Sequence, residues 1–179
     1  MKTGLGVFSS VGIEDRVRRV DELDLEPIKF KLVHDSDGES WTVERVDRVE
    51  RDYKRFLELM LRNLLSGRLE SIVPSKEVDE FWHAHILDTA KYMGDCEYCF
   101  GFYLHHFPYL GLRGAEDALE LKKHFQATRE YYREVFGEQC VSEGSSVCTS
   151  CGTANCAPEP SCSGDPSPTR TQVRPVLAR

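Results

Sequence analysis

The sequence has no apolar stretch long enough to cross a membrane and no excess of basic residues. A membrane-spanning helix needs about 20 consecutive, mainly apolar residues, and no segment of this chain reaches that length. The 23 Lys and Arg residues against 30 Asp and Glu residues give a formal net charge of −7, whereas nucleic-acid binding requires a concentrated basic surface. We therefore expect neither a membrane nor a nucleic acid as a partner. The first eight residues make a poor secretion signal because their apolar stretch is broken, so we expect a cytoplasmic protein.

The C-terminal part of the chain lacks the residues that build a core. Residues 138–179 contain no Lys, Phe, Trp, Tyr, Ile or Met and are rich in Ser, Pro, Thr and Cys. Such a segment cannot bury enough apolar surface to offset the entropy cost of ordering it. We predict one compact domain in residues 1–137, followed by a disordered cysteine-rich tail in residues 138–179.

Five of the seven cysteines lie in this tail. An odd number of cysteines does not suit a complete disulfide framework, so reduced thiols are the simpler interpretation. Four of them could supply the thiolates of a zinc or other soft-metal site: Cys148, Cys151, Cys156 and Cys162. The alternatives are a redox-active tail, a substrate for a modifying enzyme, and a solvated extension.

Hydrophobic periodicity predicts a mainly α fold for the domain. Apolar residues recur at helical spacing in four segments, residues 12–24, 41–65, 75–93 and 115–136. A further short element is expected at residues 95–106, after a break at Gly94. Residues 28–32 alternate between apolar and basic, which predicts a short strand or extended segment near the N-terminus.

Residues 78–106 contain four of the six histidines and two of the seven cysteines. Imidazole and thiolate bind borderline-soft metals well, and histidine is also the usual proton carrier near neutral pH. On a regular helix, Asp79 and His83 share one face, whereas His85 lies on the apolar face. The side chains of His83 and His85 then point roughly 200° apart and cannot bind one ion unless the helix is distorted.

A chain reversal near Gly94 would bring the residues that follow it towards His85. We therefore predict a zinc or iron site with the ligands His83, His85, Cys96 and His105. His83 would join this site through an irregular turn, or else pair with Asp79 on the outer face of the helix.

Two carboxylates accompany these candidate ligands. Asp79 and Asp88 are candidates for a catalytic base or for a group that orients an imidazole. Asp88 lies three positions after His85, within reach on a helix. The alternative is that His85 is a core histidine satisfied by a local hydrogen bond.

Several motifs in the same order resemble the glycine-rich domain-containing protein-like family. The resemblance runs from about Tyr53 to Gly114 and includes Tyr92 and the pair Asp95-Cys96. Its longer segments are residues 53–57, 73–79, 82–89, 100–101 and 105–109. The resemblance implies an α-helical module and no particular reaction. Plant relatives carry a separate glycine-rich segment and are linked to stress and hormone responses, but this chain has only 13 Gly and no such segment.

Three functions are consistent with these features. The first is a metal-binding helical module whose reaction the sequence does not specify, with a tail that also chelates metal. The second is a metal-free module that binds a protein partner. The third is a precursor or metal-delivery protein whose cysteine tail is modified or loaded by an enzyme.

Overall fold

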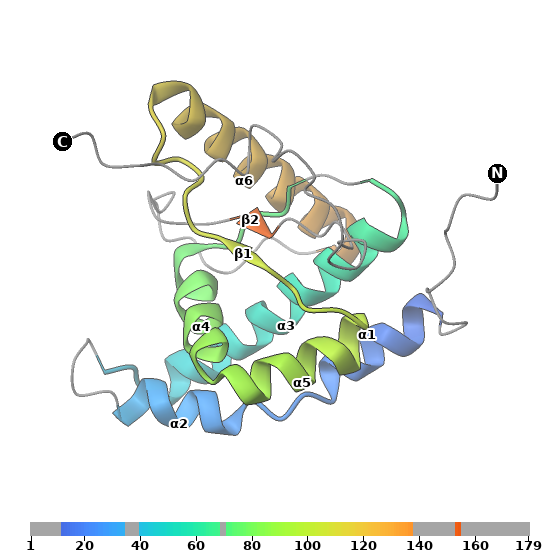
Figure 1. Cartoon of the computed structure of the whole chain (residues 1–179), viewed down its shortest axis with the longest axis vertical. Coiled ribbons are helices and arrows are strands. Elements are labelled where there is room, and N and C mark those ends of the chain that lie inside the picture. The colour runs from blue at the N-terminus through green and yellow to red at the C-terminus, as the bar shows by residue number, and fades with distance from the viewer. Residues whose placement is uncertain (1–11, 35–39, 69–70, 138–152, 155–179) are drawn as a thin grey trace, which may run out of the picture.

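A computed structural model describes residues 12–34, 40–68, 71–137 and 153–154. Its elements in chain order are α1 (Ile13–Asp21), α2 (Glu26–His34), α3 (Val43–Leu65), α4 (Lys76–Leu87), α5 (Thr89–Phe100), β1 (His106–Phe107), α6 (Ala115–Phe136) and β2 (Thr153–Ala154) (Figure 1). The predicted mainly α fold is confirmed, and α6 has the predicted bounds. The predicted tail lies outside the described residues except for β2. No helix in the described ranges is long and apolar enough to cross a bilayer.

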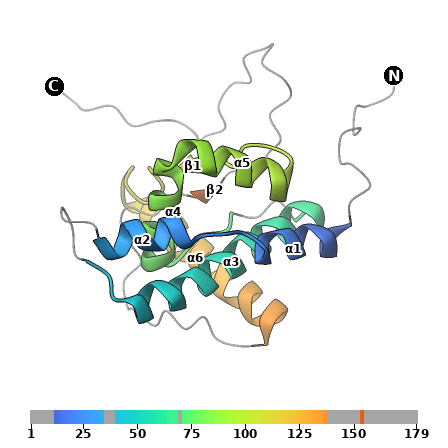
Figure 2. The ribbon, with the colours of Figure 1, turned by 90° about the horizontal axis from the view of Figure 1, so that it is seen from below.

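Helix α3 is at the centre of the fold. Helices α1, α2, α4 and α6 all contact it, and α5 packs against α1 and α4 (Figure 2). Its apolar side chains recur every three or four residues, and Val46, Val49, Tyr53, Phe56 and Met60 are buried. The side chain of Thr42 accepts a hydrogen bond from the backbone N–H of Arg45 and so begins the helix. This face places Tyr53 against His85 of α4, on the side of that helix that faces the core.

The predicted strand at residues 28–32 is wrong, because this segment lies within α2. Asp24 accepts a hydrogen bond from the backbone N–H of Glu26 and starts the helix. Ile28 is buried and Leu32 packs against the core, whereas Phe30 is 66% exposed. Residues four positions apart share a helix face. The alternating pattern therefore came from one helical face that contained Ile28 and Leu32.

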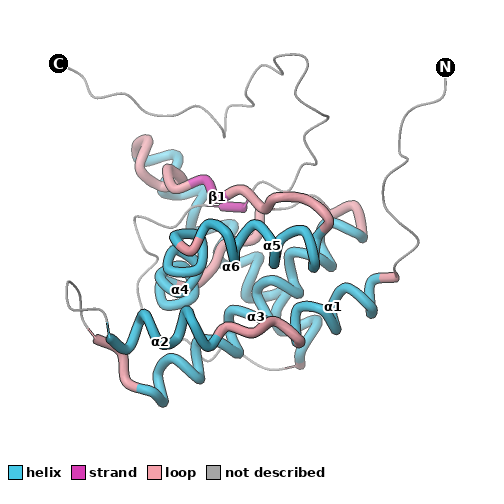
Figure 3. The backbone as a smooth tube through the Cα atoms, turned by 60° about the horizontal axis from the view of Figure 1, so that its bottom comes forward, coloured by secondary structure: helices cyan, strands magenta, loops and turns pink. Residues whose placement is uncertain are grey.

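The predicted helix over residues 75–93 is two helices that break at Asp88 (Figure 3). Asp88 has φ −83° and ψ 73°, and its side chain accepts a hydrogen bond from the backbone N–H of Lys91 at the start of α5. Gly94 lies inside α5, which ends at Gly101 with φ 78°. The predicted break at Gly94 is wrong because the carboxylate at residue 88 caps a new helix six residues earlier.

After α5 the chain runs back across α4 and forms β1. This strand pairs antiparallel with β2, with His106 opposite Ala154 and Phe107 opposite Thr153. The pairing places residues 153–154 of the C-terminal segment beside His106, the residue that follows His105.

Candidate metal centre

Helix α4 presents two different faces, as the helical spacing predicted. Val78, Phe81, Trp82 and His85 are buried in the core. Asp79 and its neighbour one turn on, His83, lie on another face, towards β1.

Three side chains meet where this second face contacts β1. Nε2 of His106 lies 3.0 Å from Oδ1 of Asp79 and 3.1 Å from Nε2 of His83. Nε2 of His83 lies 3.6 Å from Oδ2 of Asp79. The side chains of Asp79 and His106 are only 3% and 8% exposed, whereas that of His83 is 42% exposed. The cluster is therefore buried on one side and open to solvent on the side of His83.

The spacing of these atoms fits the coordination of one metal ion. Neighbouring ligands are about 3.3 Å apart around a tetrahedral zinc ion and about 3.0 Å apart around an octahedral ion with similar bond lengths. The separations of 3.0 and 3.1 Å are close to these values and are also ordinary hydrogen-bond distances. The 3.6 Å separation involves the second oxygen of Asp79, and one ligand atom from each of the three residues lies within 4.8 Å of the other two. Two imidazoles and one carboxylate are also a donor set that both zinc and iron accept.

Buried aromatic residues hold His106 in position. The hydroxyl of Tyr92 donates a hydrogen bond of 2.6 Å to the backbone carbonyl of Leu104, two residues before His106. Nε1 of Trp82 donates in turn to the Tyr92 hydroxyl at 3.0 Å. The Trp82 ring lies 4.5 Å from the His106 ring, centroid to centroid. Trp82 and Tyr92 thus fix both the strand and the imidazole that it carries.

His85 belongs to a separate network of hydrogen bonds. Its Nδ1 is 2.9 Å from the hydroxyl of Tyr53, and its Nε2 is 2.9 Å from Oδ2 of Asp95. The partners imply that the hydroxyl donates to Nδ1 and that Nε2–H donates to the carboxylate. Lys91 also donates to Asp95 at 2.9 Å. Both ring nitrogens are therefore engaged, and the carboxylate partner is Asp95 rather than Asp88, which is exposed and caps α5.

The negative charge of Asp95 stabilises the hydrogen bonds of this network. Burial alone would raise the pKa of Asp95, but the hydrogen bonds from His85 and Lys91 outweigh burial and hold the pKa below its ordinary value. The carboxylate is thus ionised and stabilises the orientation of the imidazole.

The four ligands predicted for one site do not form a single group in the described ranges. Only His83 belongs to the cluster of Asp79, His83 and His106. His105 is exposed and lies beside the ring of Tyr103. The second predicted set, Cys148, Cys151, Cys156 and Cys162, lies outside the described residues.

The cysteines of α5 are buried thiols. Burial raises the pKa of Cys96 above its ordinary value, and burial with the nearby Asp95 raises the pKa of Cys99 to about 12. Both side chains pack in the hydrophobic core, as free cysteines often do.

The sequence indicated two members of the cluster and missed the third. Asp79 and His83 are four positions apart on one helix, and their pairing was one of the two alternatives for His83. His106 was overlooked in favour of its neighbour His105. Successive residues in a strand point to opposite faces, and the sequence does not tell which of the two faces α4.

A search of curated proteins and a search of solved structures gave no significant match. The sequence does match the family model described as UCP032817-like over residues 15–142. That description contains no glycine-rich domain, so the resemblance to the glycine-rich domain-containing protein-like family stays a prediction. The match runs from within α1 to beyond the end of α6 and includes the whole cluster of Asp79, His83 and His106. The chain therefore belongs to the UCP032817-like family.

Proposed function

We propose that this protein binds one divalent transition-metal ion, zinc or iron, through Asp79, His83 and His106. The observation that carries the proposal is the mutual separation of 3.0 to 3.6 Å between one carboxylate and two imidazole nitrogens. The burial of Asp79 adds to it, because a buried carboxylate needs a cation or hydrogen-bond donors to offset its lost hydration.

Three protein ligands leave at least one position open on the ion. In proteins an open zinc site activates a bound water, and an iron site with two histidines and one carboxylate binds oxygen ligands. The half-exposed His83 marks the side from which such a ligand would enter. Asp79 takes the role of a ligand here and not that of a base.

The tail is a second part of the proposal. β2 pairs with β1 at His106, and Cys151 and Cys156 flank β2 in the sequence. This neighbourhood favours a tail that acts together with the metal site, either as a chelator that loads it or as a segment that an enzyme modifies. A partner protein that recognises the tail is part of this proposal.

Metal analysis of the full-length protein tests the site. Elemental analysis should find about one equivalent of zinc or iron in the wild type, and the metal should be lost in His106→Ala and Asp79→Asn. His105→Ala is the matched control, because it removes the adjacent but exposed histidine and should keep the metal. A cobalt-substituted protein should show a spectrum of nitrogen and oxygen ligation without thiolate charge-transfer bands.

The contribution of the tail is tested by substitutions in the full-length chain and not by truncation, because truncation would also remove β2. A variant with serine at positions 148, 151, 156 and 162, here called the tail-serine variant, should keep the metal of the Asp79 site. If metal is lost in the tail-serine variant and unchanged in His106→Ala, the proposed site is wrong. If the wild type and both variants contain no metal, the cluster is a hydrogen-bonded contact between α4 and β1.

A further inference from the structure

The short strand β1 is held in place at both of its ends. Before the strand, the hydroxyl of Tyr92 donates a hydrogen bond of 2.6 Å to the backbone carbonyl of Leu104. Within the strand, Phe107 packs against a small apolar cluster that contains Val73. The edge of a strand presents backbone N–H and C=O groups, and an extended segment can pair with such an edge as an added strand.

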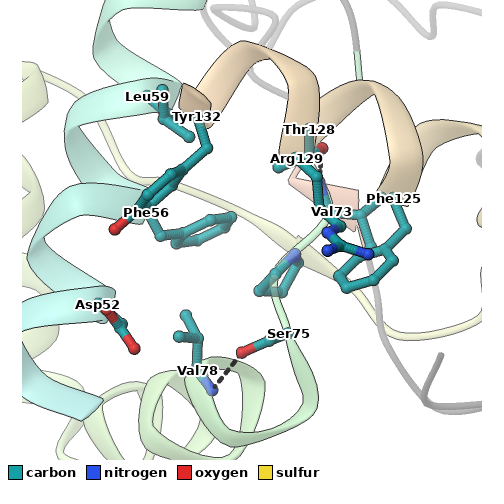
Figure 4. A pocket seen from close by; sticks show the side chains of 11 residues that line it. Asp52, Phe56, Leu59, Val73, Ser75, Val78, Phe125, Thr128, Arg129 and Tyr132 are labelled. Carbon is teal, nitrogen blue, oxygen red and sulfur yellow. Dashed lines mark hydrogen bonds between the residues drawn. The ribbon is translucent and has the colours of Figure 1, made fainter. Parts of the chain in front are cut away.

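The apolar cluster beneath Phe107 is anchored on α6. The backbone N–H of Val73 donates a hydrogen bond of 2.9 Å to Oγ1 of Thr128, and Phe125 packs against the same cluster. Figure 4 shows Val73, Thr128 and Phe125 together where the segment before α4 meets α6. The position of β1 is therefore set by α5 and α6, independently of the strand that pairs with it.

In the described ranges, the strand that occupies the edge of β1 comes from the C-terminal segment of the same chain. β2 pairs antiparallel with β1, and Ala154 lies opposite His106. Each strand is two residues long, and an isolated pair of strands is at best marginally stable in water. We therefore expect β2 to exchange between a paired and an unpaired state.

His106 takes part in two contacts at once. Its imidazole lies against Asp79 and His83, and its backbone lies opposite Ala154. A metal ion bound to the imidazole and a strand paired with the backbone both stabilise the same position of β1. Two binding events that favour the same state strengthen each other, and they do so by the same factor in both directions.

We propose that the edge of β1 is a docking site for residues 153–154 of this chain and that docking and metal binding strengthen each other. The inference rests on the proposed function, because it takes His106 as a metal ligand. The strand is paired while the metal site is filled and exchanges when the site is empty. A partner that recognises the unpaired tail then meets it chiefly in the metal-free protein.

Two proline variants of equal size test the coupling in the full-length tail-serine variant, which has no tail thiols to bind metal. The pair-breaking variant carries Thr153→Pro and Ala154→Pro, because proline has no backbone N–H and adjacent antiparallel pairs alternate in their hydrogen bonding. The control carries Ser161→Pro and Ser163→Pro, in the same segment but beyond β2. In a cobalt titration we expect affinity at least about fivefold lower in the pair-breaking variant and unchanged affinity in the control.

Hydrogen exchange measures the same coupling in the opposite direction and needs no proline. The backbone N–H groups of residues 153 and 154 are followed by NMR in the tail-serine variant, with and without zinc. We expect zinc to slow the exchange of the hydrogen-bonded groups by at least about fivefold, because exchange follows the unpaired population. Zinc should have no such effect when Asp79→Asn is added.

The outcomes separate this inference from the proposed metal site. Equal cobalt affinity in the pair-breaking variant and its control overturns the coupling and leaves the metal site as proposed. Exchange at residues 153 and 154 that zinc does not slow also overturns the coupling, although cobalt still binds. If the tail-serine variant binds neither cobalt nor zinc, the metal site and the coupling are both wrong.

Discussion

Nε2 of His83 lies 3.1 Å from Nε2 of His106, although 23 residues separate the two histidines. Two neutral imidazole nitrogens at this distance share either a proton or a cation, since two lone pairs or two N–H groups would repel each other. The carboxylate of Asp79 is within 3.6 Å of both nitrogens and would stabilise either a shared proton or a bound metal ion. The contact also joins α4 to β1. We therefore expect a metal ion bound at this contact to change the stability of the folded protein as well as its chemistry.

Zinc should stabilise the folded protein through this contact. An ion that binds only the folded state adds about 2.7 kcal/mol to the free energy of unfolding when its concentration is 100 times the dissociation constant. We expect this gain in the tail-serine variant and expect its loss when Asp79→Asn is added. Urea unfolding monitored by circular dichroism, with and without zinc, measures it. A zinc-dependent gain that survives Asp79→Asn would place the ion elsewhere.

Tyr92→Phe should weaken metal binding although Tyr92 does not belong to the cluster. The change removes the hydroxyl that joins Nε1 of Trp82 to the carbonyl of Leu104 and leaves two buried polar groups without partners. We expect a loss of about 1–3 kcal/mol in the free energy of unfolding, and metal affinity about 10-fold lower because residues that orient a ligand contribute that much.

Tyr98→Phe is the control for that experiment. Its hydroxyl donates to Glu22 on the surface at 2.8 Å, remote from His106. We expect unchanged cobalt affinity in a spectroscopic titration of this variant. If Tyr92→Phe keeps wild-type cobalt affinity while it loses stability, Tyr92 supports the core and has no role in positioning His106.

Asp95→Asn should change how stability depends on pH. The pKa of Asp95 in the folded protein lies below the ordinary value of 3.8: burial alone would raise it, and the hydrogen bonds from His85 and Lys91 outweigh burial. The unfolded chain therefore takes up this proton at a higher pH than the folded chain. The stabilisation is present above the ordinary value of 3.8 and is lost as the pH falls from there through the lower pKa of the folded protein.

Urea unfolding at a series of pH values checks this prediction. Asp95→Asn should be less stable than the wild type at neutral pH and should lose less stability on acidification. Asp21→Asn removes an exposed carboxylate and should keep the wild-type dependence. Equal flattening of the pH dependence in both variants would assign the effect to net charge and not to the contact with His85.

The helical fold was predictable because helices α1, α3 and α6 each carry a regular apolar face. The prediction of an extended segment at residues 28–32 is wrong for a local reason. Ile28 and Phe30 are similar in hydrophobicity, yet one is buried and the other is 66% exposed, and packing of α2 against α3 and α4 distinguishes them. Four or five residues are too few for helical and strand periods to be separated.

The metal ligands were predictable only where one helix determines their spacing. Asp79 and His83 lie one turn apart on α4, so their proximity follows from helix geometry. His106 reaches them through the chain reversal at Asp88 and the path of the chain after Gly101. That approach depends on tertiary packing, which a sequence pattern does not contain. The network of His85 with Tyr53 has the same origin, since the two residues are 32 positions apart on different helices.

Alanine at two glycines of α5 tests where this reversal occurs. Gly94 lies inside the helix, and a Cβ there would meet nothing within 4 Å. Gly94→Ala should therefore stabilise the protein by about 1 kcal/mol, because alanine is the better helix former. Gly101 has φ 78°, and a Cβ there would lie 3.6 Å from Nη1 of Arg16, an ordinary contact. Gly101→Ala should destabilise by about 1–2 kcal/mol through its left-handed backbone alone.

Gly94→Ala and Gly101→Ala are expected to change the free energy of unfolding in opposite directions, so their comparison is informative. If the first helix ran past Asp88 and ended at Gly94, as the sequence predicted, Gly94 would be the residue with the left-handed backbone, and its replacement would be the harmful one. Differential scanning calorimetry of both variants decides between the two. Because the path from Gly101 carries the chain to His106, Gly101→Ala should also lower metal content, whereas Gly94→Ala should not. A loss of metal in Gly94→Ala would mean that the metal site depends on the interior of α5 and not only on the path of the chain after Gly101.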